Sequence, residues 1–178
     1  MDSLGSVVNS LKKGEVIAYP TEGVWGLGCD PSNEKAITKL LNLKGRSKSK
    51  GLILIGSSLE QFSKFIEVEK YKDKLLEKWP GHHTWLVPPK PETNKLIIGN
   101  NEKIALRLSS HKQVIELCEE FKGAIISSSA NKENSPTLGS PEEIKGIFPD
   151  IKVLVGELGG LSHPSKIQDL LTGELIRG

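Results

Sequence analysis

Four cations fall within seven residues, 44–50, of this chain, in the order Lys-Gly-Arg-Ser-Lys-Ser-Lys. Like charges this close repel one another unless an anion lies among them, so the segment is either a solvated surface loop or a polyphosphate site. It fits neither usual nucleotide fingerprint, the G-x-x-x-x-G-K-[ST] loop or the G-x-G-x-x-G turn. If phosphates bind here, cationic side chains would hold them rather than a glycine-rich cradle.

A second candidate is Arg107, which lies in a run of otherwise apolar residues. In a strand, Ile104, Leu106 and Leu108 would share one face, and Ala105 and Arg107 the other. Arg107 would then point away from the apolar set. It would be either an outward salt-bridge partner or a group that binds a carboxylate.

A third candidate is the sequence Ser-Ser-Ser-Ala-Asn at residues 127–131, directly after the apolar residues 124–126. Small hydroxyl and amide side chains are common in loops, but strand ends in open α/β sheets are also where ligands lie. Residues 21–30 hold three glycines in no regular period. Such a segment lets the backbone approach a ligand or turn sharply, and it is equally what an ordinary loop contains.

The basic segment needs elements on both sides to position it. Upstream, residues 34–43 place apolar side chains on one helical face, with Asn33 or Ser32 as the N-cap. Downstream, residues 52–55 form an unbroken apolar run, which indicates a strand covered on both faces. The basic segment is therefore expected at the edge of a sheet.

Periodicity predicts elements along the rest of the chain. Helices are expected over residues 4–11, from Ser57 or Ser58 through Ile66, up to Trp79, over 114–121, and from an N-cap at Ser140. Strands are expected at 16–19, 84–87, 104–108, 124–126 and 153–155, with a closing hairpin over 167–176. This alternation predicts an α/β fold, a mixed sheet with helices packed on it. Without an internal repeat or a long linker, residues 1–178 are expected to form a single domain.

Composition narrows the class of protein. The 178 residues are 37% hydrophobic and 26% charged, which is ordinary for a soluble protein, and the net charge of +2 is too small to indicate a nucleic-acid partner. Cys29 and Cys118 lack metal-ligand spacing and fit free thiols in a reducing cytosol. No stretch resembles a signal peptide or reaches the roughly 20 apolar residues of a membrane span. We therefore expect a cytoplasmic protein that binds no membrane.

Six blocks of this sequence resemble, in order and spacing, those of the threonylcarbamoyl-AMP synthase family. They are Tyr19-Pro20-Thr21-Glu22 with Gly26-Leu27-Gly28, Lys44-Gly45-Arg46 with Lys50, Trp79-Pro80-Gly81 with Thr84, Ala105-Leu106-Arg107, Ser127-Ser128-Ser129-Ala130-Asn131, and Pro164-Ser165 with Ile167 and Asp169. Together they extend over nearly the whole chain. We expect the single-domain bacterial TsaC (YrdC) type, because no further domain follows Gly178.

This resemblance implies a twisted open mixed sheet (YrdC-like) with a basic concave face. It also implies a nucleotidyltransferase that joins L-threonine, bicarbonate or CO2, and ATP into L-threonylcarbamoyladenylate and releases pyrophosphate. The product would feed the downstream tRNA threonylcarbamoyl-transferase complex that forms threonylcarbamoyladenosine. Mg²⁺ would accompany the nucleotide, and no residue cluster indicates a metal site built by the protein itself.

The resemblance also implies roles for individual residues. Three cations match the block assigned to catalysis at the triphosphate: Lys44, Arg46 and Lys50. Beside Arg46 and Lys50, the residues expected to bind ATP are Ser129, Asn131, Thr137 and Arg177. Those expected to bind threonine are Thr21, Arg107, Ser127 and Ser165, with Arg107 as the carboxylate clamp because a guanidinium can hold both oxygens. Glu22 would close the pocket beside Thr21.

Five positions depart from the family pattern. Ser47 stands where relatives often have proline, and His82-His83 replaces a more usual Pro-x pair. Gly23 stands where many longer members have threonine, and Ile55 where some have histidine. These departures bear on the detailed contacts to threonine rather than on the reaction.

Two other classes of function remain open at this point. An RNA-binding or ribosome-maturation module could use the same basic surface, although no aromatic residue is interleaved with the cations of residues 44–50 as a stacking platform would need. Direct contact with tRNA is one form of this alternative. A relative that transfers a carbamoyl group to another acceptor is the other.

Overall fold

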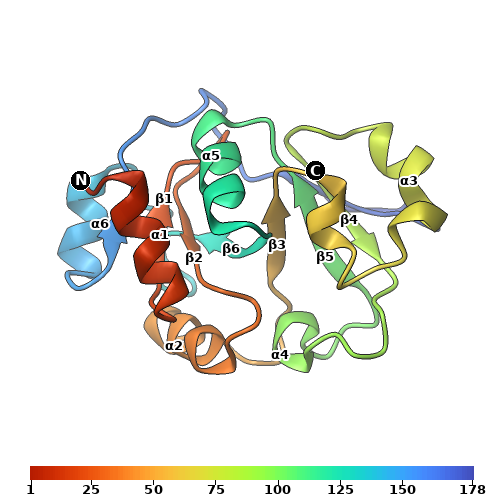
Figure 1. The fold of residues 1–178 in the computed structure, drawn as a ribbon, viewed down its shortest axis with the longest axis horizontal. Coiled ribbons are helices and arrows are strands. Elements are labelled where there is room, and N and C mark those ends of the chain that lie inside the picture. The colour runs from red at the N-terminus through yellow and green to blue at the C-terminus, as the bar shows by residue number, and fades with distance from the viewer.

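The computed structural model describes residues 1–178 and contains one sheet of nine strands. The strands are β1 (Ile17–Tyr19), β2 (Gly26–Gly28), β3 (Ile53–Gly56), β4 (His83–Val87), β5 (Ile104–Leu108), β6 (Ile125–Ser129), β7 (Lys152–Val153), β8 (Lys166–Asp169) and β9 (Leu175–Arg177). Their order is β7-β1-β2-β6-β3-β5-β4-β8-β9 (Figure 1). The pairs β1–β7, β3–β5 and β4–β8 are parallel and the other neighbours antiparallel, so the predicted mixed sheet is confirmed.

Helices cover both faces of the sheet. They are α1 (Leu4–Lys12), α2 (Glu34–Lys44), the short 3-10 helix η1 (Leu59–Phe62), α3 (Val68–Leu76), α4 (Lys95–Ile98), α5 (Lys112–Phe121) and α6 (Pro141–Ile147). Helices α1 and α5 lie side by side on one face, and the smaller core cluster joins them to Tyr19, Ile55 and Ile125 (Figure 1). The larger cluster lies on the other face, where α2 contributes Ile37 and Leu40.

The face that carries α1 and α5 is covered at only one end of the central strands. Side chains two residues apart in a strand point to the same face, so Ile53 lies on the same face as Ile55. Ile53 pairs with Ala105 of β5 and Ser127 of β6. These three residues line a cavity instead of meeting a helix. The uncovered half of the face is therefore the floor of the candidate site.

Local sequence signals explain several boundaries. The Asn33 side chain accepts hydrogen bonds from the N–H groups of Lys35 and Ala36 and so caps α2, and Ser140 caps α6 in the same way.

The hairpin β8–β9 forms where predicted, and Cys29 and Cys118 are both buried free thiols. None of the helices has the length and hydrophobicity that crossing a bilayer would need.

Three elements differ from the sequence-based expectation. Residues 59–66 form only the 3-10 turn η1, and α4 was not anticipated. Strand β2 lies inside the segment expected to be irregular. A side chain at Gly28 would come within 2.8 Å of the Tyr19 ring and 2.7 Å of the Ile126 carbonyl oxygen, so β2 is glycine-rich because the ring of Tyr19 lies over it. Strand propensity misses such a strand, because glycine is unfavourable in strands.

Candidate active site

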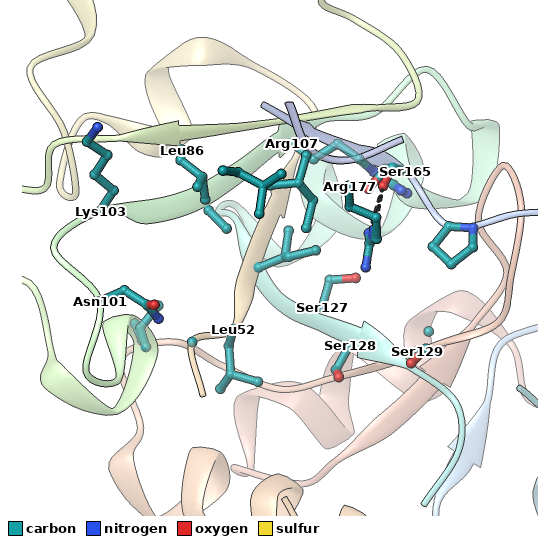
Figure 2. A pocket seen from close by; sticks show the side chains of 18 of the residues that line it. Leu52, Leu86, Asn101, Lys103, Arg107, Ser127, Ser128, Ser129, Ser165 and Arg177 are labelled. Carbon is teal, nitrogen blue, oxygen red and sulfur yellow. Dashed lines mark hydrogen bonds between the residues drawn. The ribbon is translucent and has the colours of Figure 1, made fainter. Parts of the chain in front are cut away.

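A cavity of about 530 Å³ opens on the uncovered half of the sheet. Its lining comes from segments far apart in the sequence, from Thr21 near β1 to Arg177 in β9. Figure 2 shows Arg107, Arg177 and Ser165 at one end, Lys103 and Asn101 at the other, and Leu52, Ser128 and Ser129 along one side. The mixed sheet thus joins the basic segment, the serine run and the C-terminal hairpin around one space.

Cations outnumber carboxylates in the lining. The cavity is lined by Arg46, Lys103, Arg107 and Arg177 against Glu102 and Asp169. Lys103 forms an ion pair with Asp169, and the same carboxylate accepts hydrogen bonds from the N–H groups of Leu171 and Thr172. Arg46 and Arg177 are therefore the lining cations without a carboxylate partner, while Arg107 is paired with Glu22.

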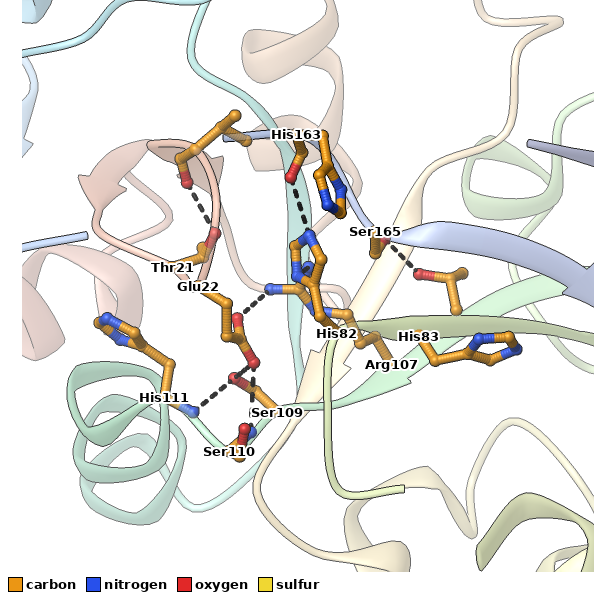
Figure 3. Close-up of polar contacts among 12 residues, drawn as sticks. Thr21, Glu22, His82, His83, Arg107, Ser109, Ser110, His111, His163 and Ser165 are labelled. Atoms are coloured by element: carbon orange, nitrogen blue, oxygen red, sulfur yellow. Dashed lines mark hydrogen bonds and ion pairs between the residues drawn. The ribbon is translucent and has the colours of Figure 1, made fainter. Parts of the chain in front are cut away.

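Arg107 is the most constrained of these arginines. Only 6% exposed, it donates from Nη2 to Glu22 Oε2 at 2.7 Å, and its Nη1 lies 3.4 Å from His82 Nδ1 (Figure 3). Its Nε–H is buried with no partner. A guanidinium has five N–H donors, so Arg107 keeps donors free while its orientation is fixed. The predicted orientation is confirmed, since Ala105 and Arg107 line the cavity and Ile104, Leu106 and Leu108 lie in the core.

Glu22 is the counter-ion that allows Arg107 to be buried. Besides the ion pair, Glu22 Oε1 accepts from Ser109 Oγ at 2.7 Å and from the Ser110 N–H at 3.2 Å. Burial alone would raise the pKa of this carboxyl group, but Arg107, Ser109 and the Ser110 N–H together lower it. Arg107 is therefore a salt-bridge partner, although a buried one rather than the outward one considered from sequence, and it also lines the cavity.

Arg46 brings the basic segment into the cavity. Its Nη2 donates to the carbonyl oxygen of Gly51 at 2.8 Å, while its Nε–H is buried without a partner. Arg177 enters from β9 and donates from Nε and Nη2 to the Ser165 carbonyl oxygen at 3.0 and 2.7 Å. Each arginine is tied to the backbone by some donors and keeps others for a ligand.

Lys44 does not line the cavity. Its ammonium group, on a residue only 2% exposed, donates to the carbonyl oxygens of Ser129 and Asn131 and to Asn131 Oδ1. Burial and the neighbouring Arg46 lower the pKa of Lys44 to about 8, which still leaves it charged at neutral pH. All three N–H donors serve the turn after β6, so Lys44 holds the serine run in place from behind.

Three other predicted residues also lie outside the lining. Lys50 forms an ion pair with Glu133, which joins the basic segment to the turn after β6. Asn131 accepts a hydrogen bond from Ser129 Oγ and donates from Nδ2 to the carbonyl oxygens of Lys132 and Ser135, so it shapes that turn. Thr137 is exposed further along the same loop.

The residues expected at the threonine end do come together. Thr21, Arg107, Ser127 and Ser165 all line the cavity, as do Arg46, Ser129 and Arg177 from the other sets. Thr21 donates to the Val24 carbonyl oxygen at 2.6 Å, and the hydroxyl of Ser165 lies 2.8 Å from that of Thr84. These contacts fix two hydroxyl groups beside Arg107.

A strap formed by residues 156–164 crosses the segment Thr21–Gly23. The N–H groups of Gly159 and Leu161 donate to the carbonyl oxygens of Thr21 and Glu22 at 3.0 and 2.9 Å. A side chain at Gly23 would overlap the carbonyl oxygen of His163. The departure at Gly23 is thus explained by the strap, and Ile55 lies in the core beneath α5 rather than in the cavity.

The sequence did not indicate several of these contacts. Ser109 donates to Glu22 and His82 contacts Arg107, while Asn101 and Lys103 line the far end of the cavity. Ser109 comes directly after β5, and the serine run stands at the end of β6. A polar residue at the end of a strand was therefore the sequence feature that could have marked Ser109 as part of the site. Nothing local distinguishes Lys103 from any other surface lysine.

Comparison with known proteins agrees with this architecture. A family model described as "Telomere recombination" (Sua5/YciO/YrdC) matches residues 9–177. The threonylcarbamoyl-AMP synthase of Aliivibrio fischeri is 42% identical over 183 residues, covering 99% of this chain and 99% of its own.

Solved structures share the fold. A variant of P. abyssi Sua5 superposes with a TM-score of 0.87 at 25% identity over 94% of this chain, which spans only 52% of that longer protein. E. coli YciO, at 24% identity, gives a TM-score of 0.84 over 98% of this chain and 87% of its own, and shows the fold alone. The match over residues 9–177 and the identity to full-length relatives lead to one conclusion: this chain belongs to the Sua5/YciO/YrdC family.

Proposed function

We propose that this chain is an L-threonylcarbamoyladenylate synthase, a nucleotidyltransferase that uses L-threonine, bicarbonate or CO2, and ATP. Curated relatives of the same length carry the name threonylcarbamoyl-AMP synthase, among them one 42% identical over 99% of both chains. The observation that carries the proposal is the single cavity that joins Arg46, Arg107 and Arg177 with the serine run. An amino-acid carboxylate and a nucleotide phosphate chain are the two anions for which this arrangement has donors.

The reaction brings anions together, which explains the arginines. The threonine amine adds to CO2 and loses a proton to give a carbamate, a carbamate oxygen attacks the α-phosphorus of ATP, and the bond to pyrophosphate breaks. Arg107 would hold the threonine carboxylate, with Thr21, Ser127 and Ser165 as hydrogen-bonding neighbours. Arg46 and Arg177 would stabilise charge on the phosphates, and the Ser129 hydroxyl would turn its single hydrogen bond from Asn131 Oδ1 to them. Fixing both reactants in one cavity removes much of the entropic cost of their encounter.

Lys44, Asn131 and Lys50 support this site in two different ways. Lys44 and Asn131 hold the turn that presents Ser129. Lys50, whose side chain is 53% exposed and paired with Glu133, would exchange that partner for the triphosphate when ATP enters. Thr137, on the same loop as Glu133, would contact the nucleotide from the rim.

Mg²⁺ would be held by the nucleotide phosphates rather than by a protein cage. Asp169 lines the cavity, but Lys103 and two backbone N–H groups already occupy its carboxylate. The free donors of Arg46 and Arg177 fit a phosphate chain. The ion would neutralise part of the charge on that chain.

The product would pass to the tRNA threonylcarbamoyl-transferase complex of the cytoplasm. The adenylate is a mixed anhydride of a carbamate and a phosphate, so it must be consumed by an enzyme with a nucleophilic acceptor. This placement of the protein within the cell is part of the proposal. The comparisons favour this enzyme over an RNA-binding module, because the full-length relatives carry the synthase name.

Release of pyrophosphate tests the proposal. Purified protein with ATP, Mg²⁺, bicarbonate and L-threonine should form pyrophosphate, and leaving out threonine should abolish it. Pyrophosphate that forms equally without threonine would instead indicate the carbamoyl-transferring alternative. No pyrophosphate under either condition would refute the enzymatic proposal.

A further inference from the structure

His82 connects the arginine of the amino-acid site with the strap that covers it. It lies just before β4, and its Nε2 is 2.8 Å from the carbonyl oxygen of His163 (Figure 3). A carbonyl can only accept, so Nε2 carries the proton and Nδ1 is the unprotonated acceptor. Nδ1 in turn lies 3.4 Å from Nη1 of Arg107, which can only donate. The two partners together specify one neutral tautomer.

The contact between His82 Nδ1 and Arg107 Nη1 adds to the bond that Glu22 accepts from Nη2. Glu22 holds Nη2 and His82 lies beside Nη1, so the plane of the guanidinium is fixed at two nitrogens. With Glu22 alone, the group could rotate about one attachment. A two-point carboxylate clamp depends on that plane, because its parallel hydrogen bonds need a defined orientation.

The contact between His82 Nε2 and the carbonyl oxygen of His163 fixes one end of the strap. Residue 163 precedes Pro164 and Ser165, whose side chains and backbone line the cavity and hold Arg177. The other end is held by His111, whose Nε2 is 3.0 Å from the carbonyl oxygen of Glu157. His82 therefore joins the amino-acid end of the cavity to the segment that carries Ser165.

We propose that neutral His82 is a positioning residue for the amino-acid site, and that its protonation at Nδ1 places a charge against Arg107 and releases that guanidinium, while the Nε2–H bond to the strap is kept. This inference rests on the proposed function, in which Arg107 holds the threonine carboxylate. It assigns a chemical role to one of the positions that depart from the family pattern.

Charges around His82 favour the neutral form. The charged and titratable groups that face it are Arg107 from β5, Glu22 from the segment after β1, and His163 from the strap. Burial lowers the pKa of His82, and Arg107 and His163 lower it further against the opposing effects of the His163 carbonyl and Glu22. Acidification below the ordinary histidine value of 6.5 would place a proton on Nδ1, facing Arg107.

Two amide variants separate the contacts. In His82→Asn the amide oxygen stands where Nδ1 stands, so it can still accept from Arg107 but does not reach His163. In His82→Gln the amide nitrogen extends to the position of Nε2 and can donate to His163. Neither variant titrates. His83→Asn is the matched control, because His83 contacts Trp85 and points away from Arg107 (Figure 3).

Threonine affinity is the measurement, because the threonine carboxylate stays ionised well below the ordinary histidine pKa of 6.5. Calorimetry that follows the pH down from about 7 through the lowered pKa of His82 should show wild-type affinity falling at least about threefold, a change that His83→Asn retains and His82→Asn loses. At about pH 7, His82→Ala should raise the threonine KM about tenfold with kcat and the ATP KM within about twofold. His82→Asn should restore most of the threonine KM.

Three results would overturn the inference while leaving the enzyme intact. The first is an unchanged threonine KM in His82→Ala. The second is a weakening of threonine binding in acid that persists in His82→Asn and so belongs to another group such as His111. The third is a nitrogen NMR spectrum that places the proton of neutral His82 on Nδ1. The spectrum needs no turnover and is informative even if His82→Ala folds poorly. Wild-type protein without threonine-dependent pyrophosphate release would instead refute the proposed function itself.

Discussion

Individual arginines contribute differently to this site because each has different partners in the protein. Arg107 is neutralised by Glu22 and held at two nitrogens, which suits a small carboxylate that must be oriented. Arg46 makes one bond to a backbone carbonyl and has no carboxylate partner within its own segment, which leaves its charge available for phosphate. Lys44, by contrast, donates all three of its N–H groups to hydrogen bonds within the protein. Residue types in a motif therefore do not by themselves reveal which cation meets the ligand.

Arg46→Ala should reduce pyrophosphate formation at least about tenfold, equivalent to about 1.4 kcal/mol of transition-state stabilisation. The reason is loss of a cation that lines the cavity beside the proposed phosphate site. Lys48→Ala is the control, because Lys48 is an exposed cation of the same segment outside the lining. Steady-state turnover of both folded variants checks this, and equal rates would remove Arg46 from the mechanism.

Glu22→Gln should lower the free energy of unfolding by about 3 kcal/mol at neutral pH, because it leaves the buried Arg107 without a counter-ion. The pKa of Glu22 is lowered in the folded protein, so this stabilisation is complete above the ordinary value of 4.5. It is then lost as the pH falls through the folded-state pKa. Urea unfolding at several pH values should show the gap to wild type narrowing in acid.

An exposed ion pair provides the control for this stability measurement. Glu15→Gln removes the partner of Lys39, in a pair whose side chains are about half exposed, and should cost less than about 1 kcal/mol. A gap for Glu22→Gln that does not change with pH would mean that the carboxylate charge is not what stabilises the fold.

At the scale of elements, amphipathic patterns predicted most of the helices and strands, and packing explains the misses. The pattern of apolar side chains in the sequence predicts three of these elements directly: the helix after residue 33, the strand at 53–56 and the hairpin at 166–177. Strand β2 does not, because the Tyr19 ring requires glycine there. The strap is equally invisible from sequence, since it is held by backbone hydrogen bonds to residues 21–22, about 140 positions away in the chain.

Gly23→Ala should weaken threonine binding, because the new methyl group would overlap the carbonyl of His163 and push the strap away. We expect an affinity loss of about tenfold, or about 1.4 kcal/mol, by calorimetry. Gly5→Ala lies in open space on α1 and should leave affinity unchanged while slightly stabilising the helix. Equal affinities in the two variants would show that the strap does not shape the threonine site.

At the scale of the whole molecule, the site exists because two helices cover only half of one sheet face. The central strands supply Ile53, Ala105 and Ser127 as a floor, and the C-terminal hairpin closes one side. The family resemblance predicted seven of the lining residues, but it did not predict that Lys44, Lys50, Asn131 and Thr137 would lie behind or beside the cavity. That distinction depends on side-chain direction in three dimensions, which spacing along the chain does not determine.

Removing residues 174–178 tests the contribution of the hairpin. Strand β9 is at the edge of the sheet, and Leu175 and Ile176 are each 54% exposed, so the remaining sheet should keep its circular dichroism spectrum. The deletion takes away Arg177 and one wall of the cavity, and pyrophosphate formation should fall more than about tenfold. Full turnover by the folded, shortened chain would show that β9 is dispensable.

The most direct test of the central claim is to identify the product formed from labelled threonine. Wild-type protein given ATP, bicarbonate and labelled L-threonine should yield an adenylate that carries the label, with one pyrophosphate released for each molecule formed. Arg107→Ala, lacking the proposed carboxylate clamp, should form far less of it at the same threonine concentration. If the label never appears on an adenylate while the folded protein still hydrolyses ATP, the cavity does not join these two substrates and the account is contradicted.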